Sequence, residues 1–533
     1  MRRVSLSMGL TRISWKPSPS CDNVDRVARR LPGLRDQRRL AVGAKNTRRP
    51  TQLTEFVVAL GVVQQVLKVD HRRDIRYERS TVYQVSIRER RASIMNRAPR
   101  VGLLFDFDFD AVAHARLADA SFRFDRAGFD LFSFPSNLGL IGFDLERFAQ
   151  GLARRARRRG WAGVVSHQDQ YGALAAALVA EAAGLPGTSP ESIIACQHKL
   201  HARRVLERVC PQANLRFAGL DCDYGQPIPQ GLRYPCFAKP VKAAFSVLAR
   251  RVDSRAELQA HTRFGRREQW LIRRLVEPFD RIVRRRLPEA GSAHRLVLEE
   301  PRRLAQYNLD GFVHEGRMQV LGVVDAIMYP GTQAFQRWEL PSRLPPPIIA
   351  RAADIARRFL TAVDFRCGLF NMEFFYDAAA GRVTVIEFNP RLASQFGDLY
   401  RRVLGLDPHA MALALAIGAD PRCLPRAEPT AAVAASLVWR AFNAREVPPM
   451  PSRARRADLA LALPDALLFT QPKTRSAIAR DLKWLDSYRY GLVHLGARDA
   501  DDLRRQCEQA AALLGWPNAP YAPGPGSPLN ADG

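Results

Sequence analysis

Two carboxylates and one amide in the second half of the chain could together hold a metal ion. Glu373 lies in one apolar, β-rich run and Glu387 in the next, and Asn389 follows Glu387 by two residues. A short loop with a turn glycine, Asp377 to Gly381, separates the two runs. This pattern predicts a β-hairpin that carries all three side chains.

The register of this hairpin decides what chemistry it can support. If Tyr376 pairs near Thr384, Glu373 falls opposite Glu387 on one face, with Cβ atoms roughly 5 Å apart. Like charges placed in this way repel. They persist if one acid is protonated, if a cation lies between them, or if the pairing slips by a residue. Oxygen ligands from both acids and Asn389 suit Mg²⁺, which keeps waters and bridges substrate phosphates. We favour this metal site over a hairpin with solvated acids.

The same residues resemble the end of an ATP-grasp domain. That family has an acid on one strand and a Glu-x-Asn-Pro-Arg run on the next, as in Glu373 followed by Glu387 to Arg391. The resemblance implies that Glu373, Glu387 and Asn389 hold Mg²⁺, or Mn²⁺, on ATP. It also implies that Arg391 steadies the transition state on the way to an acyl phosphate.

Two upstream lysines extend the resemblance. The segment from Gly184 to Lys199 resembles the family's entry segment, with Ser189 as a helix N-cap. Lys199 would be the first phosphate-binding lysine, although a lysine on such a helix is more often a solvated surface residue. Lys239 ends a strand with a Lys-Pro pair, where the family's second lysine meets the α and β phosphates.

The segment after Lys239 departs from the family pattern. Most relatives have a glycine-rich loop here, whose backbone N–H groups fold over the phosphates. Val241 to Leu248 contains no glycine, and positive φ angles are costly for its alanines and serine. We expect Ser246 to contribute to nucleotide binding and Lys242 to supply charge. The difference keeps a nucleotide-binding module without turnover as an alternative.

The resemblance also predicts where the nucleoside binds. Glu299 and Glu300 end a strand that resembles the hinge holding adenine, and Gln306 takes the place of a ribose-binding acid. The alternative is a pair of exposed acids at the end of a strand. The next predicted feature is an irregular segment from Phe335 to Ser342 beside the acceptor pocket. Its Arg337 and Trp338 could grip a carboxylate, although a packed tryptophan beside a surface arginine is the simpler interpretation.

The chain from Val101 to Ala183 alternates between strands and helices, as an α/β unit does. We predict strands over 101–107, 129–134 and 162–166, and helices over 111–127, 145–159 and 170–183. Asp106, Asp108 and Asp110 alternate after the first strand, which favours loop caps or substrate contacts over a metal site. His167 and Asp169 lie where a crevice edge is expected.

Composition and charge divide the chain. Its 533 residues are 47% apolar, enough for three or more domains. The expected fold is mixed α/β and α+β: a Rossmann-like domain, a two-lobed ATP-grasp domain and a small C-terminal lobe. The net charge is +28, and 21 basic against 8 acidic residues precede Met95. The predicted regions are a basic extension outside the core (1–94), the Rossmann-like domain (95–190), the ATP-grasp domain (191–422), the α+β lobe (423–516) and a disordered tail (517–533).

The remaining features concern location and partners. No stretch reaches the roughly 20 apolar residues of a membrane span. The eight cysteines form no closely spaced pair, which favours reduced thiols and a cytoplasmic protein. We expect a small carboxylate and an amine as substrates, and a homo-oligomer is possible. No membrane or nucleic-acid partner is expected.

The predicted function is an ATP-dependent ligase that activates a carboxylate as an acyl phosphate for attack by an amine or similar nucleophile. Biotin carboxylase usually continues its Asn-x-Arg with Leu-x-Val-Glu-His. Here Arg391 is followed by Leu-Ala-Ser-Gln-Phe, so that base is missing and bicarbonate chemistry is not expected. The alternatives are a degenerate nucleotide-binding module and a basic protein that binds nucleic acid or ribosomes.

Overall fold

The computed structural model describes residues 98–118, 121–131, 139–222, 224–243, 248–517 and 519–521. The predicted extension over 1–94 lies outside the described residues, as does most of the predicted tail over 517–533. In the part of the chain that is described, no helix is long and apolar enough to cross a membrane.

The first unit is a small parallel sheet with helices. Its strand order is β2-β1-β3, which matches the α/β unit expected from the sequence. Its elements are β1 (Arg100–Leu104), α4 (Asp108–Ala118), β2 (Arg123–Ala127), α5 (Leu145–Arg159), β3 (Trp161–Val165) and α6 (Gly172–Ala183). Helix α5 has the predicted bounds because Asp144 caps its N-terminus and Gly160 ends it in the left-handed conformation.

The predicted helix over 111–127 was wrong, and residues 129–131 of the predicted strand over 129–134 are not in a strand, whereas 132–134 lie outside the described residues. Helix α4 ends at Ala118, and strand β2 occupies 123–127 instead. Phe122 and Phe124 alternate along the chain, and their rings lie 6.0 Å apart. This period of two is a strand pattern.

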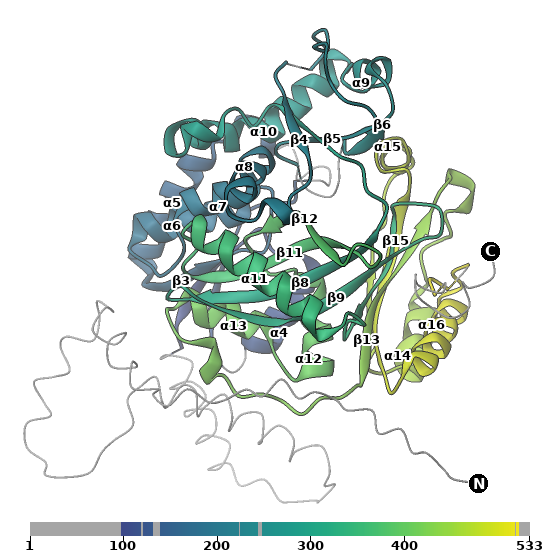
Figure 1. The fold of residues 1–533 in the computed structure, drawn as a ribbon. Coiled ribbons are helices and arrows are strands. Elements are labelled where there is room, and N and C mark those ends of the chain that lie inside the picture. Colours follow the sequence, from purple (N-terminus) through teal and green to yellow (C-terminus); the bar gives the residue numbers. More distant parts are fainter. Residues whose placement is uncertain are drawn as a thin grey trace, which may run out of the picture. The chain divides into compact units, whose positions relative to one another are not determined.

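A second sheet of four antiparallel strands has the order β4-β7-β5-β6. Figure 1 shows β4, β5 and β6 near the top, close to α9. The segment comprises α7 (Pro190–Gln197), α8 (Lys199–Val209), η3 (Pro211–Ala213), β4 (Phe217–Leu220), β5 (Cys236–Pro240), β6 (Arg250–Val252), α9 (Arg255–His261), α10 (Arg266–Arg286), η4 (Pro288–Ala290) and β7 (Leu296–Glu299). Helix α10 carries Arg284, Arg285 and Arg286 in its last turn.

The largest sheet has eight strands in the order β12-β11-β8-β9-β10-β13-β15-β14, all paired antiparallel. Its first part contains β8 (Ala305–His314), β9 (Arg317–Met328), β10 (Phe335–Leu340), α11 (Pro346–Ala362), β11 (Gly368–Asp377), β12 (Arg382–Asn389), η5 (Ser394–Phe396), α12 (Gly397–Leu404), α13 (Pro408–Ala416) and η6 (Pro421–Cys423). One face packs against α11 through side chains such as Phe359 and Phe388, and the other packs against α12 and α13.

The last unit continues the same sheet. Strand β13 pairs with β10, and helices α14 and α16 pack beside β13 and β15, as Figure 1 shows in yellow-green. Its elements are β13 (Val433–Ala441), η7 (Ala444–Glu446), α14 (Arg453–Ala462), β14 (Leu467–Thr470), α15 (Arg475–Leu485), β15 (Tyr488–Ala497) and α16 (Ala500–Leu514). Asp499 caps the start of helix α16, and Gly515 ends it in the left-handed conformation.

Candidate active site

The hairpin of β11 and β12 brings its two acids directly opposite each other. Glu373 pairs with Glu387 in the strand register, and Asn371 pairs with Asn389. The Nδ2 atom of Asn389 lies 3.3 Å from Glu373 Oε1 and 3.5 Å from Glu387 Oε1. The three predicted ligands therefore share one face of the sheet.

The pairing near the turn differs from the prediction by one residue. Tyr376 pairs with Val383 and not with Thr384, but the register shifts between Glu373 and Phe374. This β-bulge adds one residue to β12 and restores the expected pairing of the acids. The bulge also turns backbone carbonyls outward: Val385 O and Ile386 O each accept a hydrogen bond from Arg203 at 2.8 Å.

The two acids hold different protonation states. Burial, together with the negative charge of Glu387, raises the pKa of Glu373 to about 8. Burial also disfavours the charged form of Glu387, but Lys199 and Lys239 outweigh it and lower the pKa of Glu387 to about 2. The pair therefore favours binding one proton, and the contact of Lys199 with Glu387 favours Glu373 as the site of that proton.

Lys199 contacts the charged member of this pair. Its Nζ lies 2.8 Å from Glu387 Oε2 and donates to Ala243 O at 3.2 Å. Ser189 caps α7 as predicted, but that helix ends at His198. His198 then caps α8, so Lys199 is the first residue of a new helix. Although burial disfavours its charge, Glu387 and Asp169 raise the pKa of Lys199.

Lys239 reaches the site from the four-stranded sheet. Its Nζ lies 2.8 Å from Glu299 Oε2 and 3.5 Å from Ile386 O. Glu299 also accepts from Arg203 Nε at 2.7 Å, and all three side chains are buried. Arg203 lies four residues after Lys199 on α8 and thus on the same helix face. These contacts join the four-stranded sheet to the hairpin.

The other residues that were predicted to bind the nucleotide do not all lie together. Gln306 Nε2 donates to Glu373 Oε2 at 2.9 Å, beside the predicted metal ligands. Glu300 pairs with Arg216 at 2.6 Å and also with Arg302. Ser246 lies outside the described residues.

Arg391 lies at the end of the hairpin, next to a loop of the first unit. Its Nε is 4.0 Å from Asp169 Oδ1, and Asp169 also accepts hydrogen bonds from Gln197. Lys242 donates to Asp169 O at 2.9 Å and lies 4.6 Å from the Phe279 ring. Burial lowers the pKa of Lys242 to about 8.

Solved structures with a similar fold include ligases that act on small molecules. An L-amino acid ligase from Bacillus licheniformis aligns with a TM-score of 0.56 and 15% identity, over 78% of this chain and 97% of that one. N5-carboxyaminoimidazole ribonucleotide synthetase from Thermus thermophilus aligns at 0.52 and 16% identity, over 79% and 100%. N5-carboxyaminoimidazole synthase from Aspergillus clavatus, in complex with ADP and 5-aminoimidazole ribonucleotide, aligns at 0.51 and 14% identity, over 78% and 99%. No family model matches the chain, and no curated protein sequence matches it significantly. The chain has the ATP-grasp fold.

Within this ATP-grasp fold, sequence reasoning missed a row of buried polar residues beside the paired acids. Asn371 Nδ2 donates to Asp310 Oδ1 at 3.0 Å, and Tyr400 Oη donates to Asp310 Oδ2 at 2.8 Å. Burial raises the pKa of Asp310 to about 6. Asn371 precedes Glu373 by two residues, so strand alternation already placed it on the same face. Arg203 was also missed, although its helical spacing from Lys199 was visible in the sequence.

The predicted irregular segment from Phe335 to Ser342 was wrong, because most of it forms strand β10. Trp338 packs against Phe396 in the core. Arg337 is buried, pairs with Glu339 at 2.6 Å and lies 4.4 Å from the Tyr521 ring. Successive residues of a strand face opposite sides of the sheet, so Arg337 and Trp338 cannot bind the same carboxylate together.

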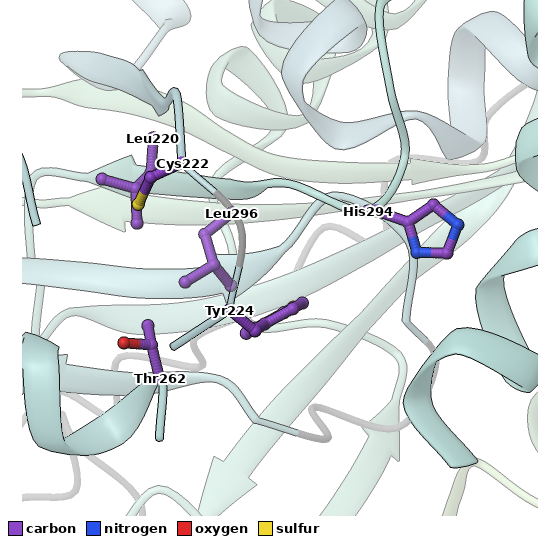
Figure 2. A pocket seen from close by; sticks show the side chains of 6 residues that line it. All are labelled: Leu220, Cys222, Tyr224, Thr262, His294 and Leu296. Atoms are coloured by element: carbon purple, nitrogen blue, oxygen red, sulfur yellow. The ribbon is translucent and has the colours of Figure 1, made fainter. Parts of the chain in front are cut away.

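A small pocket of the ATP-grasp fold lies away from these residues. Its lining is shown in Figure 2: Leu220, Cys222, Tyr224, Thr262, His294 and Leu296, with His294 to one side. Leu296 and Leu298 of β7 belong to the core on this side, whereas Glu299 faces Lys239. The four-stranded sheet therefore separates the pocket from the lysines, and the pocket is not part of the candidate site.

Proposed function

We propose that this protein is an ATP-dependent ligase that phosphorylates a small carboxylate and joins it to an amine or similar nucleophile. The observation that carries the proposal is the convergence of Lys199, Lys239 and Asn389 on the paired acids Glu373 and Glu387. Two cations, two acids and one amide on facing elements suit a nucleotide phosphate with its metal ion.

The donor set fits a hard divalent cation. Glu373, Glu387 and Asn389 offer oxygen ligands from one sheet face, and Glu373 carries a proton that a cation would replace. These three residues would hold Mg²⁺ or Mn²⁺. Such an ion would neutralise phosphate charge. Lys199 has a flexible stem, so it would exchange Glu387 for a phosphate oxygen when nucleotide binds.

The proposed reaction has two steps. A carboxylate oxygen of the substrate attacks the γ-phosphorus, the bond to the bridging oxygen of ADP breaks, and an acyl phosphate forms. The amine then attacks the carbonyl carbon, a C–N bond forms, and inorganic phosphate leaves while the amine loses a proton. Lys199 and Lys239 would stabilise phosphate charge, and Arg391 would steady the acyl phosphate.

The remaining site residues take supporting roles in this proposal. Gln306 would orient Glu373, to which it already donates. Glu299 would hold Lys239 and Arg203 in place beneath the phosphates. Glu300, next to it on the chain, and Ser246 stay proposed contacts of the nucleotide. The free cysteines in the described chain support a cytoplasmic location.

The test is a screen for ADP release with paired amino acids and small carboxylates as acceptors. The proposal requires that ADP form only when both Mg²⁺ and a suitable pair are present. ATP binding without ADP release for any pair would support the degenerate nucleotide-binding module instead. Glu387→Gln should abolish the release of ADP. Glu181→Gln changes an exposed carboxylate that pairs with Arg286, and it should leave the release of ADP unchanged.

A further inference from the structure

A second cluster of potential metal ligands lies at the junction of three segments. Asp110 comes from the first turn of α4, His167 follows β3, and His409 is the second residue of α13. All three side chains are buried, and one ligand atom from each lies within 4.8 Å of the others. His409 Nε2 is 3.0 Å from Asp110 Oδ1.

Several nitrogens here have no hydrogen-bond partner. Among the described residues, His167 Nε2 and both ring nitrogens of His114 are buried and make no hydrogen bond. His114 Nδ1 lies 3.5 Å from Asp106 Oδ2 without hydrogen-bond geometry. A buried polar group without a partner loses its hydrogen bonds to water and gains none in the protein, so the arrangement calls for a further partner.

His114 belongs to the same cluster. It follows Asp110 by four residues on α4, so both side chains lie on one helix face. Its ring centre is 5.8 Å from that of His409 and 6.3 Å from that of His167. His114 is thus a buried neighbour of the three grouped ligands.

An ion pair between α4 and α13 is the simplest alternative. It explains His409 and Asp110, whose Oδ2 also accepts from Phe107 N at 2.9 Å. It leaves His167 Nε2 and His114 without a role. A second observation supports a built site: a Cβ at Gly397 would come within 2.6 Å of the His409 ring, so only glycine leaves room for this imidazole.

We propose that Asp110, His167 and His409 bind one divalent transition-metal ion of the zinc class, with His114 as the candidate fourth ligand. Imidazole nitrogens with one carboxylate suit Zn²⁺, whereas Mg²⁺ and Ca²⁺ prefer oxygen alone. Bonds of about 2.0–2.1 Å at tetrahedral angles separate ligand atoms by about 3.3 Å, close to the His409–Asp110 spacing.

The ion would have a structural role close to Arg391. It would link the loop after β3, which carries Asp169, to helices α4 and α13. Asp169 in turn lies beside Arg391 and holds Lys242 through its backbone carbonyl. This site differs in ligand chemistry and position from the Mg²⁺ site on the hairpin, and it does not depend on the proposed ligase activity.

The experiment uses the full chain without a histidine tag. The protein is stripped with a chelator, incubated with Zn²⁺, dialysed and analysed for zinc by mass spectrometry. We expect about one zinc per chain, and Co²⁺ in its place should give the intense visible bands of a tetrahedral site. His167→Gln and His409→Gln should each weaken zinc binding by more than about 10–100-fold, the loss caused even by outer-shell changes.

His294→Gln is the matched control, because His294 lies in a separate group with Glu277 and Asp280. It should retain zinc. Anomalous diffraction at the zinc edge from the unmodified protein locates the ion without any variant, so misfolding of a variant leaves the result intact. A folded chain that binds no zinc, or zinc located away from Asp110 and His409, would overturn the proposal.

Discussion

Glu373 faces Glu387 directly across the β11–β12 ladder, and of these two acids only the second has a lysine, Lys199, within 2.8 Å among the described residues. This asymmetry explains why one acid stays charged while the other takes up a proton. The protein keeps a repulsive pair at the one place where the proposed function requires a cation. The predictions below test this relationship and the groups that support it.

The first prediction concerns the charge of Glu387. Glu387→Gln keeps the shape of the side chain but removes the charge that would bind a metal ion and that pairs with Lys199. We expect a folded protein with ATP turnover reduced by at least about 100-fold, because removing one electrostatic contact to the reacting groups typically costs that much. Circular dichroism and ADP release measure the two properties. Turnover close to that of the unmodified protein would exclude the metal-ligand role.

The second prediction concerns pH. The pKa of Glu373 is raised to about 8 from an ordinary value of 4.5. Between pH 4.5 and about 8, the folded, metal-free state therefore binds one more proton than the unfolded state. The stabilisation of the folded state by this proton is fully present below pH 4.5 and is lost as the pH rises through the folded pKa of about 8. A cation must displace that proton, so Mn²⁺ affinity in the presence of a non-hydrolysable ATP analogue should rise by up to about tenfold per pH unit below about pH 8.

Glu373→Gln is the control for this pH dependence. It lacks the titrating proton, while the nucleotide titrates as before. The difference in slope between the two proteins isolates Glu373. Equal slopes in calorimetric titrations would show that Glu373 does not take part in binding the cation.

The third prediction concerns Lys239. Lys239→Ala should weaken binding of the ATP analogue by about 1.5–3 kcal/mol, the value of a hydrogen bond to a charged group. Isothermal titration calorimetry gives this difference. Lys473→Ala, which removes a lysine paired with Asp481 on α15, should leave the affinity unchanged. An unchanged affinity for Lys239→Ala would favour a chain that no longer handles phosphates here.

The fourth prediction concerns the buried pair of Arg203 and Glu299. Arg203→Met should lower the free energy of unfolding in urea by an amount near the lower end of about 3–5 kcal/mol, since Lys239 still neutralises Glu299. Arg357→Met removes an exposed pair with Asp354 and should cost less than about 1 kcal/mol. Similar losses for both variants would contradict the structural role of Arg203.

Local patterns predicted much of the fold and part of the candidate site. Helix α5 has its predicted bounds because capping residues mark both of its ends. The pairing of Glu373 with Glu387 was also predicted, although by a register that is one residue off at the turn. A β-bulge in β12 restores the pairing of the two acids. Arg203 donates hydrogen bonds to two carbonyls at this bulge, and no local pattern reveals this contact between distant segments.

The strand β10 shows the opposite case. Arg337 and Glu339 look like exposed loop residues, but they neutralise each other inside the protein. They lie two residues apart on one face of the strand, and their charges hid the alternation that marks a strand. The cluster of Asp110, His167 and His409 combines residues as far as 299 positions apart, which no local pattern reveals.

The most direct test of the central claim follows an oxygen atom. The carboxylate substrate found in the ADP-release screen is labelled with heavy oxygen and incubated with the enzyme, Mg-ATP and the amine, and the released phosphate is analysed by mass spectrometry. Because the carboxylate oxygen attacks the γ-phosphorus and stays on it when the amine displaces phosphate, each phosphate should carry one labelled oxygen. Phosphate without the label, formed together with ADP and coupled product, would contradict an acyl phosphate intermediate.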